Sequence, residues 1–188
     1  MPRPRPATAV DSREALALAL QALHVESTAY WDAIPTSEFL TPIGDAWSPA
    51  EHVRHLSKSM RAVTRGLRLP TFVVRLSFGG STGNSRSYDE ICDDYREALG
   101  SGASAGAFAP GRRQPYSTPE AERARIMSRH AEVLQALVGS IGRWSERQLD
   151  RCQLPHPLLG PLTVREMLFF TLYHNRHHLD GVRRRRGG

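Results

Sequence analysis

The stretch TVREMLFFTLYHNRHHLDGV, Thr163 to Val182, decides the fold of this chain. Its apolar residues recur at intervals of three and four, which predicts an amphipathic helix, and Thr163 and Glu166 form a capping box at its start. His174 and His178 lie one turn apart on one edge of the inward face, where two imidazoles can bind a single metal ion. The inward face comprises Val164, Met167, Leu168, Thr171, Leu172, Leu179 and Val182.

Three further segments carry the same periodicity and have clear start signals. They run from about Ser12 to Ala33, from Ser48 to Leu67 and from Thr118 to Ile141. The second begins with Ser-Pro-Ala-Glu, which is a capping box with proline at the first helical position. Four amphipathic helices with a crossover between the second and third predict an all-α, up-and-down four-helix bundle. The expected core stripes comprise Leu16, Leu20, Leu23 and Tyr30 on the first helix, and Ile126, Val133, Leu137 and Ile141 on the third.

The connection between the second and third helices, residues 70–116, is unusually long for a compact domain. Two stretches rich in glycine and serine flank a short predicted helix, YDEICDDYREAL. TFVVRLSF, residues 71–78, is the only plausible strand in the chain. We interpret the connection as an insertion that is a lid, a crossover or a partly disordered segment.

Basic residues are concentrated at the two ends of the chain. The formal charge is +6 and the pI is near 10, but all 19 acidic residues lie between Asp11 and Asp180, where 18 Arg and one Lys balance them. We therefore expect a single domain over residues 11–182, basic flexible tails at 1–10 and 183–188, and no specific nucleic-acid partner.

The chain lacks the signals of a membrane or secreted protein. No apolar run is long enough to span a bilayer, and the N-terminus has no apolar segment of a secretory signal. Cys92 and Cys152 have no C-x-x-C partner, which argues against a disulfide framework and against a thiolate zinc site. We expect a cytoplasmic protein without a membrane partner.

A second pair of histidines, His52 and His55, opens the second predicted helix. One of them could join His174 and His178 in a facial site of three histidines, which leaves positions open for water or substrate, as in catalytic zinc sites. The centre of the uncharged sector lies nearer His52. The His55 side instead carries small residues that would let a neighbouring helix approach, namely Ser59, Ala62 and Gly66.

The remaining histidines carry weaker signals. His130 lies on the apolar face of the third helix, which favours a core residue over a ligand. His177 falls well outside the inward face, and His24 and His156 are a helix-surface residue and a loop residue without partners in the sequence.

Two segments of the sequence resemble the signature regions of the DinB-like (DNA-damage-inducible) metalloprotein superfamily. They are GDAWSPAEHVRHL, residues 44–56, and HPLLGPLTVREMLFFTLYHNRHHL, residues 156–179. The resemblance implies a four-helix bundle, often homodimeric, that binds a divalent metal, zinc or nickel, through three histidines. Counted from Trp47, the family register selects His55, His174 and His178 as ligands and leaves His52 as a core or pocket-wall residue.

The same resemblance implies a class of reaction. Relatives include thiol-dependent S-transferases and isomerases that use low-molecular-weight thiols, so we expect a metal-dependent transferase acting on a small electrophilic molecule. A metal-dependent hydrolase uses the same kind of site, and a non-catalytic metal-binding stress-response protein is the alternative from another class. No acid or base side chain can be selected from the sequence.

Overall fold

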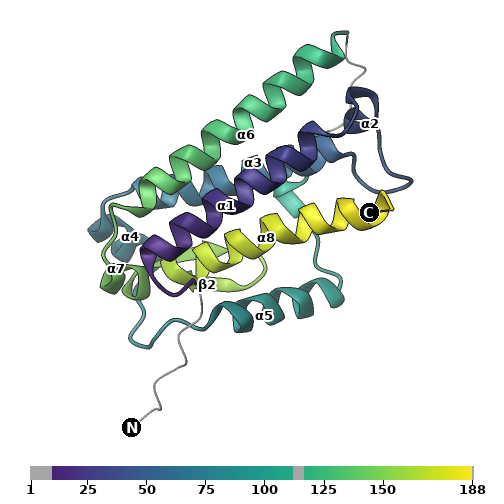
Figure 1. Ribbon diagram of the computed structural model, residues 1–188. Helices are drawn as coiled ribbons and strands as arrows, with labels where there is room; N and C mark the ends of the chain where they lie inside the picture. Colours follow the sequence, from purple (N-terminus) through teal and green to yellow (C-terminus); the bar gives the residue numbers. More distant parts are fainter. Residues whose placement is uncertain (1–9, 112–116, 188) are drawn as a thin grey trace.

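The computed structural model describes residues 10–111 and 117–187 (Figure 1). Along the chain the elements are α1 (Arg13–Asp32), α2 (Thr36–Leu40), α3 (Pro49–Arg68), α4 (Thr71–Phe78), α5 (Tyr88–Gly100), the 3-10 helix η1 (Gly106–Phe108), α6 (Pro119–Ile141), α7 (Glu146–Arg151), β1 (Gln153–His156), β2 (Gly160–Thr163) and α8 (Val164–Arg185).

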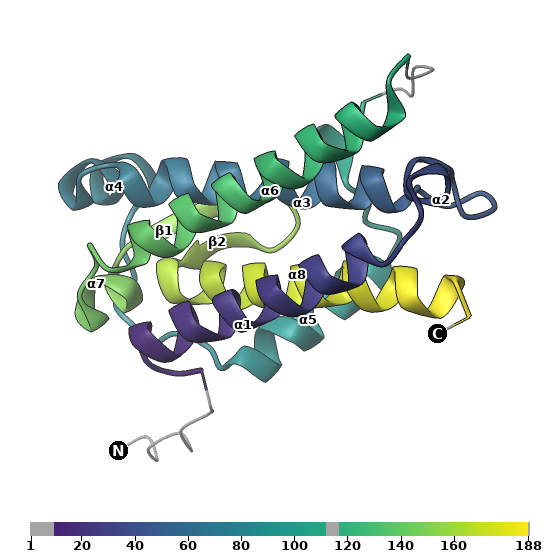
Figure 2. The ribbon, with the colours of Figure 1, turned by 45° about the horizontal axis from the view of Figure 1, so that its top comes forward.

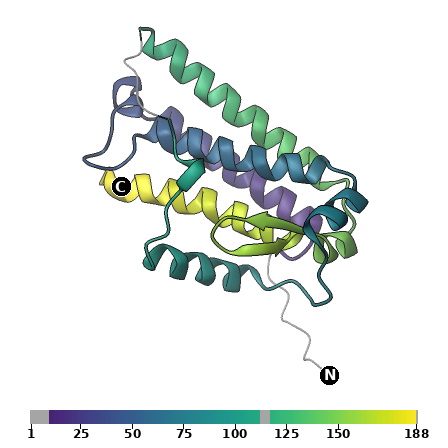
Figure 3. The same cartoon turned by 180° about the vertical axis from the view of Figure 1, so that it is seen from behind.

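The four long helices form a bundle in which α1 and α3 each pack on both α6 and α8 (Figure 1). The expected all-α four-helix bundle, with a long connection between its second and third helices, is confirmed. This connection carries the chain back along the bundle as α5, so α3 and α6 run in the same direction. Figure 3 shows α5 and the β hairpin on the same side of the bundle.

The helices that carry the histidine pairs begin where the sequence predicts. At the start of α3, Ser48 Oγ accepts the N–H of Glu51, and the Glu51 carboxylate accepts the N–H of Ser48 at 2.8 Å. Thr163 and Glu166 make the same reciprocal bonds at the start of α8. Such caps satisfy otherwise unpaired N–H groups and each contribute about 1 kcal/mol. They therefore help to fix both helix starts.

The buried residues of α1 and α6 are those of the predicted apolar stripes, except at one position on α1. Leu16, Leu20 and Leu23 are buried, but Trp31 takes the place expected for Tyr30, which is only half-buried. All four residues of the predicted α6 stripe are buried as well. Trp144 adds a polar anchor, because its indole N–H donates to the carbonyl of Leu67 at 3.0 Å.

The strand prediction is wrong twice: the predicted strand is a helix, and the observed strands were not predicted. The segment TFVVRLSF is helix α4, because Pro70 precedes its first turn, only Val74 is buried and Gly79, with φ of 84°, ends it. The strands of the described residues are instead β1 and β2, an antiparallel hairpin with Gly160, φ 71°, at its turn. The short helices α2 and α7 were not predicted from the sequence, whereas the short helix expected in the long connection is α5.

The C-terminal arginines do not form the expected flexible tail. Helix α8 continues to Arg185, because Arg183 pairs with Glu26 of α1 at 2.8 Å and Arg186 pairs with Glu38 of α2. The N-terminal tail predicted for residues 1–10 lies, apart from Val10, outside the described residues.

Two further observations concern the whole described part of the chain. Cys92 and Cys152 are both free and buried. No helix within residues 10–111 and 117–187 combines the length and the apolar character that a bilayer crossing requires.

Candidate metal centre

Helices α3 and α8 bring three histidines together inside the bundle. The Nε2 atom of His174 lies 3.0 Å from Nε2 of His55 and 3.0 Å from Nε2 of His178. One ring nitrogen from each residue can be chosen so that all three lie within 4.8 Å of one another. The histidine triad, His55, His174 and His178, therefore matches the set that the family register selected.

Hydrogen bonds at the outer nitrogens orient two of the rings. Nδ1 of His55 donates to the carbonyl of Phe108 at 2.9 Å. Because a carbonyl cannot donate, the neutral His55 ring carries its proton on Nδ1, and its Nε2 presents a lone pair to the triad. Nδ1 of His178 lies 2.8 Å from Nδ1 of His52, so His52 stands behind the triad.

Burial keeps these histidines neutral. Desolvation lowers the pKa of His52 to about 4, lowers that of His55, and holds those of His174 and His178 well below the ordinary value. The neighbouring imidazoles of the cluster lower the pKa values of His174 and His178 further. Neutral imidazole is the form that binds metal, so the environment favours the ligand state.

Trp47 covers the triad from the loop before α3. Its ring is stacked on that of His178, with a centroid distance of 6.2 Å and an interplanar angle of 7°, and lies 5.2 Å from that of His55. Trp47 belongs to the sequence region that carried the family resemblance. Its place in the structure gives that position a physical reason, since it shields the triad.

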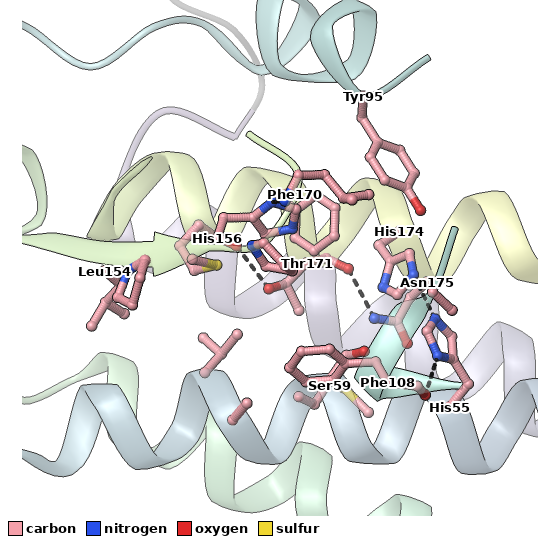
Figure 4. A pocket seen from close by; sticks show the side chains of 18 of the residues that line it. His55, Ser59, Tyr95, Phe108, Leu154, His156, Phe170, Thr171, His174 and Asn175 are labelled. Carbon is pink, nitrogen blue, oxygen red and sulfur yellow. Dashed lines mark hydrogen bonds between the residues drawn. The ribbon is translucent and has the colours of Figure 1, made fainter. Parts of the chain in front are cut away.

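The triad faces a cavity of about 570 Å³, within the usual size of a small-molecule pocket (Figure 4). Its walls come from α3, α5, the segment around η1, the hairpin and α8, and most of the lining side chains are apolar. The triad end is formed by His55, His174 and His178, and the hairpin end by residues 154–158. Figure 4 shows Phe170 between His156 at the hairpin end and His174 at the triad end.

Tyr95 supplies an acid group that the sequence analysis could not identify. It comes from α5, lines the cavity, and its ring lies 5.8 Å from that of His174 and 5.1 Å from that of Phe170. Figure 4 shows its hydroxyl pointing toward His174. Burial raises the pKa of Tyr95 to about 12, so the phenol keeps its proton and acts as a hydrogen-bond donor.

His156, expected to be a loop residue without partners, is buried at the end of β1. Its Nδ1 accepts the backbone N–H groups of Leu158 and Leu159 at 3.3 and 3.1 Å, and its ring lies 4.2 Å from that of Phe170. Desolvation lowers its pKa to about 4. The missed hairpin explains the wrong placement, although the Pro-Leu-Leu-Gly run that follows His156 was a turn signal.

Of the other expectations, the one for His130 is confirmed and the one for the small residues of α3 is not. His130 is a core residue whose Nδ1 lies 3.0 Å from Ser57 Oγ, as predicted. His177 lies beside the triad without joining it. The small residues of α3, Ser59, Ala62 and Gly66, line the cavity. The close neighbour at Gly66 is the hairpin, because a Cβ there would lie 2.8 Å from Leu154.

Comparisons with known proteins agree with this architecture. The family model of the DinB superfamily matches residues 12–180. The structure is similar to that of TT2238, described as a four-helix bundle protein, with a TM-score of 0.53 and 16% identity over 92% of this chain and 99% of that one. It is also similar to YfiT from Bacillus subtilis, described as a probable metal-dependent hydrolase with an unusual four-helix bundle topology. The TM-score is 0.57 and the sequence identity 14%, over 98% of this chain and 91% of that one. A search of curated proteins gives no significant match.

Proposed function

The chain belongs to the DinB superfamily, and from this premise we propose that it is a divalent-metal-dependent enzyme. His55, His174 and His178 would hold the ion, and their converging Nε2 atoms are the donors they would offer. The observation that carries the proposal is the convergence of these three ring nitrogens at the wall of a cavity. Zinc is the first choice for three neutral imidazoles, and nickel is the second.

The residues behind the triad fit such an ion. Because Nδ1 of His55 donates to the Phe108 carbonyl, the lone pair on Nε2 of His55 is available to the ion. For His178 to offer its own Nε2 lone pair to the ion, its Nδ1 must donate to Nδ1 of His52. The neutral His52 ring then carries its proton on Nε2. Carbonyls and side chains that hold the outer nitrogen are the usual supports of metal-bound histidines. His52 is thus a positioning residue.

The ion would supply a nucleophile near neutral pH by lowering the pKa of a bound water or thiol. Residues of the chain itself exclude water and stabilise developing charge. Trp47 and Phe170 exclude bulk water from the triad end. The Tyr95 hydroxyl donates a hydrogen bond to an oxygen of the substrate and so stabilises negative charge that develops there.

The nucleophile distinguishes two classes of reaction. With a low-molecular-weight thiol the enzyme is an S-transferase acting on an electrophile, as the family resemblance implies. With water it is a hydrolase, and the description of YfiT as a probable metal-dependent hydrolase favours this second candidate. The same cavity would hold the small-molecule substrate in both cases.

Metal content and activity of tag-free protein test the proposal together. We expect about one divalent ion per chain, and activity that a chelator abolishes and the metal restores. Hydrolysis of p-nitrophenyl esters without thiol indicates the hydrolase, whereas thiol-dependent conjugation of 1-chloro-2,4-dinitrobenzene indicates the S-transferase. Metal-loaded protein that fails in both assays across several thiols would favour the non-catalytic role. Protein without bound metal would refute the site.

A further inference from the structure

Nε2 of His156 is a polar group of the cavity that the proposed metal chemistry does not use. Nδ1 of this neutral ring accepts two backbone N–H groups, so its proton resides on Nε2. The side chain lines the cavity and the residue is only 8% exposed. Within residues 10–111 and 117–187 this N–H makes no hydrogen bond, and Nε2 is not one of the fully enclosed unpaired nitrogens, so a ligand or water in the cavity can reach it. In a cavity with mostly apolar walls, a ligand that supplies the acceptor for this N–H gains a hydrogen bond there.

The surroundings of this N–H are apolar. The Phe170 ring lies 4.2 Å from the imidazole, and Leu154, Met167 and Leu158 line the cavity nearby. Among the described residues that line the cavity, Arg65 alone carries a full charge, and it is exposed to solvent. A ligand with several charges would lose its hydration here without finding partners, whereas an apolar body gains by burial.

We propose that the cavity binds a mainly apolar small molecule with a neutral acceptor oxygen, such as a carbonyl, and that the Nε2–H of His156 donates to this oxygen. His156 is therefore a specificity-determining residue. Because Phe170 lies between His156 and His174, the acceptor sits about one aromatic ring's width from the group held at the triad end. Only this last placement rests on the proposed function, since the triad end must be where the reaction occurs.

If His156 had a purely structural role, only its cap on the hairpin turn would matter, and loss of the Nε2–H would not change ligand binding. Its Nδ1 caps the hairpin turn, which would explain a histidine at this position without any ligand. Asparagine can make the same turn, because its side-chain oxygen accepts from N–H groups two and three residues ahead. It lacks an N–H that reaches as far as Nε2. His156→Asn therefore keeps the cap and removes only the donor in the cavity.

Two probes of almost equal size separate the hydrogen bond from apolar burial. Benzophenone carries a carbonyl where diphenylmethane carries a methylene group. We would measure the Kd of both by isothermal titration calorimetry on the protein as purified, with its metal content determined. Wild type should bind both and prefer the ketone. His156→Asn should weaken benzophenone binding about three- to tenfold, the usual worth of one neutral hydrogen bond, and leave diphenylmethane within roughly twofold.

A matched control is His156→Gln, whose amide N–H can approach the position of Nε2 but cannot cap the turn. It should keep part of the preference for the ketone while lowering Tm, the reverse of His156→Asn. The proposal is wrong if wild type binds neither probe, shows no preference for the ketone, or keeps an undiminished preference in His156→Asn.

Metal content, measured on the same preparations, keeps the two proposals apart. The His156 variants should retain full metal, and His174→Ala should lose metal yet keep the preference for the ketone. Loss of that preference in His156→Asn with the metal site intact or absent supports the cavity proposal either way. Full metal content without any ketone preference would leave the enzyme proposal standing and overturn this one.

Discussion

The two ends of the cavity are built in different ways. At the triad end, the three histidines project from two long helices that have capping boxes and pack directly on each other. At the hairpin end, His156 stands on a two-stranded turn. Tyr95, which lies beside His174, also comes from a connection, because helix α5 inside the long connection brings it into the cavity. In the proposed enzyme, the bundle would therefore hold the reactive centre, while the connections would determine what can enter.

The strongest test of the triad end is removal of single ligands. His55→Ala and His174→Ala should each lower metal affinity by orders of magnitude, because each removes one of three donors. His52→Ala should lower it only about 10- to 100-fold, the usual cost of losing a residue that orients a ligand. Competition with a chromophoric chelator measures all three. If His52→Ala empties the site while His55→Ala leaves it full, the ligand assignment is wrong.

The next largest effect should come from Tyr95, the donor supplied by the long connection. Tyr95→Phe removes one hydroxyl and should lower kcat about 10²- to 10³-fold, as loss of a single transition-state donor does elsewhere. Metal content and Tm should remain close to wild type. An unchanged kcat would reduce Tyr95 to a wall residue and weaken the view that the connection contributes to chemistry.

Acidification should destabilise the fold through two buried neutral histidines, His156 at the hairpin end and His130 in the core outside the cavity. The pKa values of His130 and His156 are lowered to about 4, so their unfolded counterparts bind protons first as the pH falls below about 6.5. The free energy of unfolding should therefore fall between pH 6.5 and 4, by about 1.4 kcal/mol per pH unit for each such histidine. Urea unfolding of metal-free protein at pH 7, 6 and 5 measures this. In His156→Asn the slope should be shallower, and a flat wild-type profile would contradict the prediction.

The smallest effect should come from the C-terminus, which touches neither end of the cavity. Deletion of residues 183–188 removes the ion pairs of Arg183 with Glu26 and of Arg186 with Glu38. Partly exposed pairs of this kind contribute about 0–1 kcal/mol each, so Tm should change little and metal content not at all. Any retention of the full chain on nucleic acid at low salt should disappear. Salt-resistant, sequence-selective DNA binding by the truncated chain would contradict the charge argument.

The same contrast explains what could be predicted from the sequence. Helical periodicity and capping boxes are local signals, so the four long helices, His174 and His178 followed from the residues themselves. His55 needed the family register, since the wheel alone favoured His52. Tyr95 and His156 could not be found, because their places depend on how α5 and an unpredicted hairpin dock on α8. Helix α4 was mistaken for a strand because a short apolar run carries no clear period.

Phe108 contributes to both the triad and the cavity. Its backbone carbonyl holds Nδ1 of His55, its side chain lines the cavity, and the neighbouring carbonyl of Ala107 accepts from Lys58 of α3. A cavity ligand that orders η1 would therefore also align a metal ligand. Thermodynamic linkage requires the reverse, so bound metal should raise the affinity of that cavity ligand by the same factor by which the ligand raises metal affinity. The protein would then hold its ion most tightly when its cavity is filled.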